Sequence, residues 1–143
     1  MAHIHEKLDF CVEVFIVYED RLLLRLHDKL GIWLSVGGHV EPDEDFEQAA
    51  LREVREEVGL DIELVGSPLT IDERNLQRDF RTVLAPRYMG RHPISSTHDH
   101  VVGIYFGRAS TDVVVLEKPT DKVMWVTRSE ILDEKIPLVG NVR

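Results

Sequence analysis

Most apolar residues of this chain fall into short runs rich in β-branched and aromatic types, a pattern typical of β-strands. The first two runs, residues 9–18 and 21–27, are separated only by Glu19 and Asp20, and this spacing predicts a β-hairpin with a tight turn. Further strands are predicted at residues 32–38, 61–66, 69–73, 80–89, 100–109 and 123–127.

One segment, residues 45–58, has the composition of a helix, because Glu, Gln, Ala, Leu, Arg and Val dominate it and neither Gly nor Pro interrupts it. Asp45 is a good N-cap, and Gln48 three residues later completes a capping box. Gly59 stands where a residue in the left-handed conformation commonly ends a helix. The start and stop signals therefore agree on a helix over this segment.

A second, shorter helix is predicted at residues 130–135, with Ser129 as its N-cap. Strands interspersed with these helices, without an internal repeat or a break in composition, predict one α/β domain over residues 1–143. Its mixed sheet would pack between helices. The single cysteine, Cys11, excludes a disulfide within the chain and a zinc site built from several cysteines.

The formal net charge of −9 repels nucleic acid and anionic membranes, so we expect neither as a partner. The N-terminus lacks the pattern of a signal peptide, and no apolar run reaches the roughly 18 residues of a membrane span. A cytoplasmic protein is therefore expected. An acidic protein that acts on a phosphorylated substrate needs a local cation to offset this repulsion.

Three glutamates of the predicted helix, Glu53, Glu56 and Glu57, lie within about 100° of arc on a helical wheel. The apolar residues on the same side are Phe46, Ala49 and Ala50. Clustered carboxylates repel one another and lose hydration when partly buried, and a divalent cation would offset both effects. Carboxylates spaced in this way suit Mg²⁺ or Mn²⁺. On this geometry alone, a metal site and a solvated helix face paired with arginines remain equal alternatives.

The segment upstream of the helix adds a longer pattern. Gly38 is followed after five residues by Glu44, and after seven more by R-E-V-R-E-E-V-G-L, residues 52–60. This pattern resembles the signature of the Nudix hydrolase family, G-x5-E-x7-R-E-U-x-E-E-x-G-U with U aliphatic, at every fixed position. The matching residues are Gly38, Glu44, Arg52, Glu53, Val54, Glu56, Glu57, Gly59 and Leu60.

The resemblance extends to the strand pair before this motif, to W-L-S-V-G-G and to V-M-W-V-T-R-S-E-I-L, so that it covers most of the chain. Residues 74–98 resemble the family only loosely. Val36 departs from the family pattern, because many members have proline before the paired glycines. Proline there would only stiffen the approach, so the departure bears little on catalysis.

The resemblance implies an α/β/α sandwich that hydrolyses a nucleoside diphosphate linked to another moiety, with Mg²⁺ or Mn²⁺ as cofactor and a small-molecule nucleotide as substrate. The implied metal ligands are Gly37, through its carbonyl, and Glu53, Glu56 and Glu57. The implied catalytic residues are Arg52, Glu53 and Glu56. Arg52 would orient the carboxylates by charge-assisted hydrogen bonds, and Glu44 would hold the loop to Arg52.

The proton acceptor is a carboxylate of this cluster or one outside the motif, and the candidates outside it are Asp99, Glu117 and Asp121. His98 and His100 flank Asp99 and share one face of a predicted strand. Such a pair is compatible with a zinc site, but two polar histidines at the start of a strand are more often simply exposed.

Arg25 and Trp33 are the candidate substrate-binding residues. Arg25 would reach a phosphate and Trp33 would stack on a base, whereas the alternatives are an exposed strand residue and a core residue. A set of arginines would attract a polyphosphate or balance nearby acidic residues, and its members are Arg74, Arg78, Arg81, Arg87 and Arg91. No motif names the base or sugar of the substrate.

Two other functions compete with hydrolysis. A sensor domain would bind a nucleotide without turnover, and related folds carry out isomerase or glycosyl-transfer chemistry. Both usually accompany an altered motif, so the intact motif favours a hydrolase. The resemblance also admits a homodimer, although nothing in the sequence indicates an interface.

Overall fold

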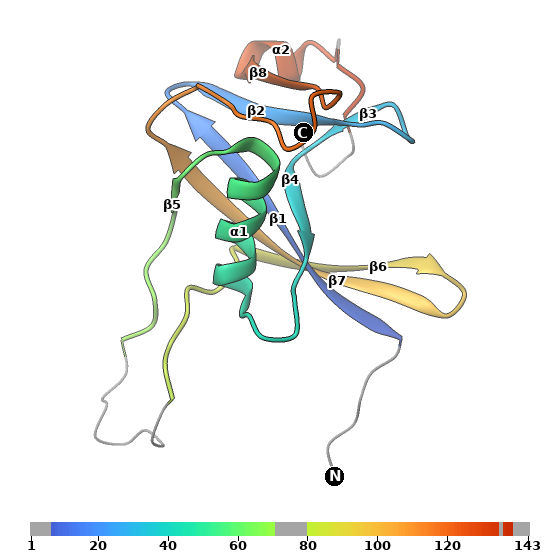
Figure 1. The fold of residues 1–143 in the computed structure, drawn as a ribbon, viewed down its shortest axis with the longest axis vertical. Helices are drawn as coiled ribbons and strands as arrows, with labels where there is room; N and C mark the ends of the chain where they lie inside the picture. The colour runs from blue at the N-terminus through green and yellow to red at the C-terminus, as the bar shows by residue number, and fades with distance from the viewer. Residues whose placement is uncertain (1–6, 71–79, 135, 139–143) are drawn as a thin grey trace.

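The computed structural model describes residues 7–70, 80–134 and 136–138, which form one mixed β-sheet and two helices (Figure 1). The strands are β1 (Leu8–Tyr18), β2 (Arg21–His27), β3 (Ile32–Leu34), β4 (Val36–His39), β5 (Ile62–Leu64), β6 (Tyr88–Ser95), β7 (His98–Ala109) and β8 (Val123–Thr127). The helices are α1 (Phe46–Val58) and α2 (Arg128–Leu132). The predicted α/β fold with a mixed sheet is confirmed. Within the described part of the chain, neither helix is long and apolar enough to cross a membrane.

The centre of the sheet is β1, which pairs in parallel with β7 and antiparallel with β2 and β4. β2 also pairs with β3 and β8, while β5 and β6 pair with opposite ends of β7. Parallel and antiparallel pairs therefore meet in one sheet. β4 pairs with the middle of β1, and the loop from β4 to α1 begins beside Phe10, near the start of β1.

The hydrophobic core lies between α1 and one face of β1. Alternate residues of β1 point into it, and α1 contributes small and β-branched side chains. These fully or almost fully buried residues include Val12, Val14, Ile16, Ala49, Ala50, Val54 and Val58. Because side chains alternate along a strand, Asp9, Cys11 and Glu13 lie on the opposite face of β1. One face of β1 thus forms the hydrophobic core with α1, and the other face lies away from that core.

The helix predicted at residues 45–58 is confirmed, as are both of its ends. The Asp45 carboxylate accepts a hydrogen bond from the Gln48 N–H at 2.8 Å, and the Gln48 side chain accepts one from the Asp45 N–H at 3.0 Å. Gly59 ends the helix with a φ of 66°, where a glycine avoids the strain of a side chain. The predicted hairpin is also confirmed, because Tyr18 pairs with Arg21.

The single strand predicted at residues 32–38 is wrong, because the chain is interrupted at Ser35 and forms two strands. β3 pairs with β2, whereas β4 pairs with β1. The chain changes partners at Ser35, and one continuous strand cannot follow both partners. A break that depends on two distant partners leaves no local pattern in the sequence.

The region before β7 also differs from prediction. The strand predicted at 80–89 begins only at Tyr88 and then continues to Ser95. Pro93 is tolerated there because, among the described residues, β6 pairs only with β7 and shifts register beside this proline. In the strand predicted at 69–73, Leu69 and Thr70 are irregular, and residues 71–73 lie outside the described residues.

The second helix begins two residues earlier than predicted. Its N-cap is Thr127 rather than Ser129, because the Thr127 hydroxyl accepts from the Glu130 N–H and the Glu130 carboxylate accepts from the Thr127 N–H. This reciprocal capping box fixes the start of α2. The helix ends at Leu132, and Lys135, the predicted last residue, lies outside the described residues.

Candidate active site

Paired glycines at the end of β4 lie against the carboxylates of α1. A Cβ atom on Gly38 would overlap the Glu53 carboxylate, and one on Gly37 would overlap the carbonyl oxygen of Val12. The N–H of Gly37 donates to Glu57 Oε2 at 3.3 Å. The missing side chains therefore let the backbone of β4 approach both carboxylates closely.

The three motif glutamates differ in exposure. The side chains of Glu53 and Glu57 are 13% and 12% exposed, whereas that of Glu56 is 53% exposed. Burial raises the pKa of Glu57 to about 7, against the opposing effect of nearby Arg25. Burial also raises the pKa of Glu53. The two inner carboxylates thus lack enough positive charge around them to offset their burial.

The guanidinium of Arg52 joins these carboxylates to the preceding loop. Its Nη1 donates to Glu53 Oε1 and to Glu56 Oε2, both at 2.9 Å. Its Nε and Nη2 donate to Glu44, with a shortest distance of 2.6 Å, and Nη2 also donates to the carbonyl of His39 at 2.9 Å. The hydrogen bond from Arg52 lowers the pKa of Glu44. Arg52 thereby fixes the loop, the end of β4 and two glutamates in one network.

A second arginine reaches the remaining glutamate from β2. Nη1 of Arg25 lies 3.5 Å from Glu57 Oε1, and its Nη2 donates to Asp121 Oδ2 at 3.3 Å. The side chain of Asp121 is only 3% exposed. Arg25 Nε is buried and has no hydrogen-bond partner among the described residues. Arg25 and Asp121 were predicted from the sequence as two separate candidates, and no sequence pattern indicated that they form a pair.

A cavity of about 370 Å³ opens on the sheet face away from α1. Residues of β1, β2, β3, β4, β6 and β7 line it, among them Arg25, Gly37 and Gly38. Leu34 also lines this cavity and is the register partner of Arg25, so the adjacent Trp33 points to the other face of β3. The structure therefore brings Arg25 to the cavity but does not bring Trp33 there.

The proton-acceptor candidates outside the motif separate into two groups. The N–H of Glu117 donates to the carbonyl of Glu57 at 3.4 Å, and Asp121 is bound to Arg25, so both lie near the cluster. Asp99 instead forms an ion pair with Arg91 at 2.6 Å, which lowers the pKa of Asp99, and it does not line the cavity.

Two of the arginines within residues 74–91 also pair with acidic residues close to them in space. Arg81 pairs with Asp45 at 2.7 Å and Arg91 pairs with Asp99, so these two balance nearby acidic residues. Arg74 and Arg78 lie outside the described residues.

The histidines predicted to share a strand face do so, with ring centroids of His98 and His100 5.2 Å apart. The rings of His39 and His92 lie 5.0 Å and 5.5 Å from that of His100. Burial, followed by the charges of the other three histidines, lowers the pKa of His100. The sequence could not group these four residues, because they come from β4, β6 and β7.

The donor set on α1 fits Mg²⁺ or Mn²⁺. It offers carboxylate oxygens from Glu53, Glu56 and Glu57, and the backbone of Gly37 lies beside them. Hard oxygen donors are those that these cations prefer. A bound cation would also stabilise the charged form of the two buried carboxylates, whose pKa values are raised in its absence.

The chain matches the model of the NUDIX domain over residues 10–140. The CTP pyrophosphohydrolase of Escherichia coli (strain K12) is 34% identical over 73 residues, which cover 51% of this chain and 53% of that protein. An NAD-capped RNA hydrolase of Stutzerimonas stutzeri (strain A1501) is 45% identical over 51 residues, or 34% of this chain and 18% of that protein. The matches thus span about half, or less, of these curated relatives.

Solved structures resemble the fold over nearly its whole length. A hydrolase of the NUDIX family from Clostridium perfringens has a TM-score of 0.77 and 29% identity, covering 93% of this chain and 89% of that one. The MutT NUDIX hydrolase from Burkholderia pseudomallei has a TM-score of 0.66 and 21% identity, covering 95% of this chain and 93% of that one. The second likeness concerns the fold alone.

Proposed function

The chain belongs to the Nudix family, and we propose that it is a pyrophosphohydrolase that cleaves a nucleoside diphosphate linked to another moiety with the aid of Mg²⁺ or Mn²⁺. One observation carries this proposal: Glu53 and Glu57 are buried against the paired glycines of β4, and the pKa of each is raised. Burying such carboxylates costs stability in a purely structural helix, whereas a divalent cation is bound by them.

Glu53, Glu56 and Glu57 are the proposed side-chain ligands, joined by the carbonyl of Gly37. When bound, the cation supplies a positive charge for the phosphate oxygens and lowers the pKa of a coordinated water. Arg52 holds Glu53 and Glu56 by hydrogen bonds of 2.9 Å, so these carboxylates are oriented before a cation or substrate arrives. This orientation is the proposed role of Arg52 in catalysis.

The attacking water must lose a proton to a nearby base. Glu56 is a suitable acceptor, because its side chain is 53% exposed and can pass the proton on to bulk water. Arg25 is the proposed contact to the substrate phosphate. Arg25 lines the cavity and lies 3.5 Å from Glu57, so a phosphate bound in the cavity beside the cluster would gain a charge-assisted hydrogen bond from it.

The substrate is proposed to be a small nucleotide or nucleotide derivative. The two curated relatives are named for CTP and for NAD-capped RNA, so CTP and NAD belong among the compounds tested. The cavity is bounded by strands outside the family motif, and specificity must come from those strands. We propose that a single domain, which the family model matches over residues 10–140, carries out the hydrolysis.

The test is a hydrolysis assay with Mg²⁺ or Mn²⁺ on a panel of nucleoside triphosphates, NAD, ADP-ribose, dinucleoside polyphosphates and nucleotide sugars. Reaction in ¹⁸O-labelled water, followed by mass spectrometry of the products, identifies the phosphorus that is attacked. We expect turnover of at least one compound and a strong reduction by Glu57→Gln. Inactivity on the whole panel with both metals would overturn the proposal, and tight binding without any product would favour a sensor domain.

A further inference from the structure

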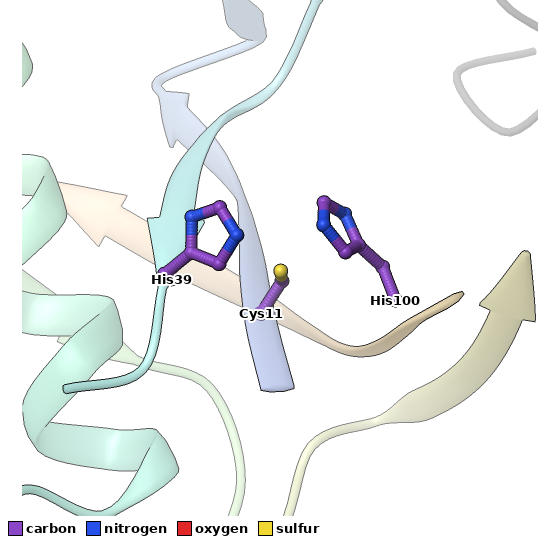
Figure 2. A group of neighbouring side chains, drawn as sticks. All are labelled: Cys11, His39 and His100. Carbon is purple, nitrogen blue, oxygen red and sulfur yellow. The ribbon is translucent and has the colours of Figure 1, made fainter. Parts of the chain in front are cut away.

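A group of imidazole and sulfur side chains lies on the sheet face away from α1. Strand register creates this group: Cys11 of β1 is paired with His39 of β4, and Asp9 of β1 is paired with His100 of β7. Register partners project from the same face of a sheet, as do residues two apart along one strand. Figure 2 shows Cys11, His39 and His100 gathered from three neighbouring strands around one space.

The spacing of these side chains suits a metal ion. The thiol sulfur of Cys11 and one ring nitrogen each of His39 and His100 all lie within 4.8 Å of one another. Tetrahedral zinc, with bonds of about 2.0–2.3 Å, needs ligand atoms about 3.3–3.8 Å apart. Side-chain movements of about 1 Å would therefore bring the three ligands to bonding distance.

The chemistry of the donors separates this group from the carboxylates of α1. A thiolate and two imidazoles form a borderline-soft donor set that suits Zn²⁺ and is poor for Mg²⁺. We propose that Cys11, His39 and His100 form a zinc site, distinct from the carboxylate cluster. Binding would displace the thiol proton of Cys11 to solvent, as zinc ligation by cysteine requires.

A second combination, Asp9 with His98 and His100, also meets the spacing criterion, but it lacks sulfur. The Asp9 carboxylate lies 3.0 Å from His98 Nε2 and 3.5 Å from His39 Nε2. It is therefore placed to orient imidazoles as an outer partner, a role that carboxylates commonly have around zinc sites. We assign Asp9 this positioning role.

The proposed zinc site shares its surroundings with the proposed hydrolase site. Cys11, His39 and His100 all line the cavity that Arg25 also lines, so the open fourth position of the ion would face that cavity. The carbonyl of His39 also accepts a hydrogen bond from Arg52 at 2.9 Å. A metal on the His39 ring would thus anchor the strand end that helps to hold Arg52.

The test uses the full chain, freed of any affinity tag and of bound metal, without substrate. Excess Mg²⁺ is added first to occupy the carboxylates, and Co²⁺ is then titrated as a spectroscopic substitute for Zn²⁺. We expect one Co²⁺ per chain, with thiolate-to-cobalt charge transfer and the intense visible bands of a tetrahedral site. Zn²⁺ should displace the Co²⁺, and competition with a chromophoric chelator should give its affinity. A titration without the charge-transfer band would overturn the proposal.

Variants test the ligand set. Cys11→Ser should abolish the charge-transfer band, and His39→Gln should weaken zinc binding by more than about tenfold. His39 is the safer variant for folding, because its side chain is 60% exposed whereas Cys11 is buried. His92→Gln is the matched control, since His92 also contacts His100 but is outside the ligand set. Unchanged zinc affinity in His39→Gln would refute the site. Because these measurements need no turnover, their failure is distinguishable from failure of the proposed function.

Discussion

Replacing Glu57 with Gln should stabilise the metal-free protein while it impairs metal binding. The Glu57 side chain is 12% exposed, and burial raises its pKa from 4.5 to about 7. Gln has nearly the same shape, can still accept the hydrogen bond from the Gly37 N–H, and carries no charge. The substitution therefore removes an unfavourable buried charge without opening a cavity.

The magnitude follows from proton linkage. Because the folded-state pKa lies above the unfolded value, the folded protein binds the proton more tightly. The contribution of Glu57 to stability is complete below pH 4.5 and is lost as the pH rises through about 7. A shift of that size corresponds to about 3 kcal/mol between pH 4.5 and pH 8. Glu57→Gln should avoid this loss and, for a chain of this size, raise the Tm at pH 8 by roughly 10 °C.

The assay is thermal unfolding of both proteins in a chelator at pH 5 and pH 8, and then with saturating Mn²⁺. The Gln variant should be the more stable at pH 8 without metal, and this difference should shrink at pH 5. Mn²⁺ should raise the Tm of the natural protein and have a smaller effect on the variant. For the comparison without metal, Glu56→Gln is the matched control, because the Glu56 side chain is 53% exposed. A Gln variant less stable than the natural protein at pH 8 without metal would refute the reasoning.

Three further substitutions test other parts of the site. Gly38→Ala should weaken Mn²⁺ binding and lower kcat at least about tenfold, because the Cβ of the alanine would displace the Glu53 carboxylate. Isothermal titration measures the Mn²⁺ affinity, and steady-state kinetics measure kcat. Asp121→Asn should lower the free energy of unfolding in urea by about 1–3 kcal/mol, since it weakens the partly buried hydrogen bond to Arg25; no change would mean that Arg25 is held by other contacts. Asp45→Ala should lower the free energy of unfolding by about 1 kcal/mol through loss of the N-cap, and unchanged Mn²⁺ affinity would show that the cap acts on stability alone.

The sequence predicted best the elements whose causes are local. Asp45, Gln48 and Gly59 all act within a few residues of the helix ends that they define, so the bounds of α1 were predictable. Glu19 and Asp20 likewise form the turn between β1 and β2. Where the cause is a distant partner, prediction failed: the chain changes partners at Ser35, and β6 owes its length to pairing with β7.

The same distinction applies to the candidate site. The family motif contains Arg52 and the glutamates of α1, so their proximity follows from helical spacing and one short loop. The partner of Arg25 lies 96 positions away, and only the pairing of β2 with β8 brings Asp121 close to it. No pattern within a single segment contains that information.

His39 shows why the family motif can indicate the reaction without identifying the substrate. Its carbonyl accepts a hydrogen bond from Arg52, so its backbone belongs to the motif network, whereas its ring lies beside Cys11 and faces the cavity. The backbone contact needs no particular side chain, and the family pattern accordingly leaves this position unspecified. The ring is therefore free to differ between members of the family without disturbing the carboxylates. Residues of this kind, on β1, β4, β6 and β7, form the cavity wall that a substrate would contact.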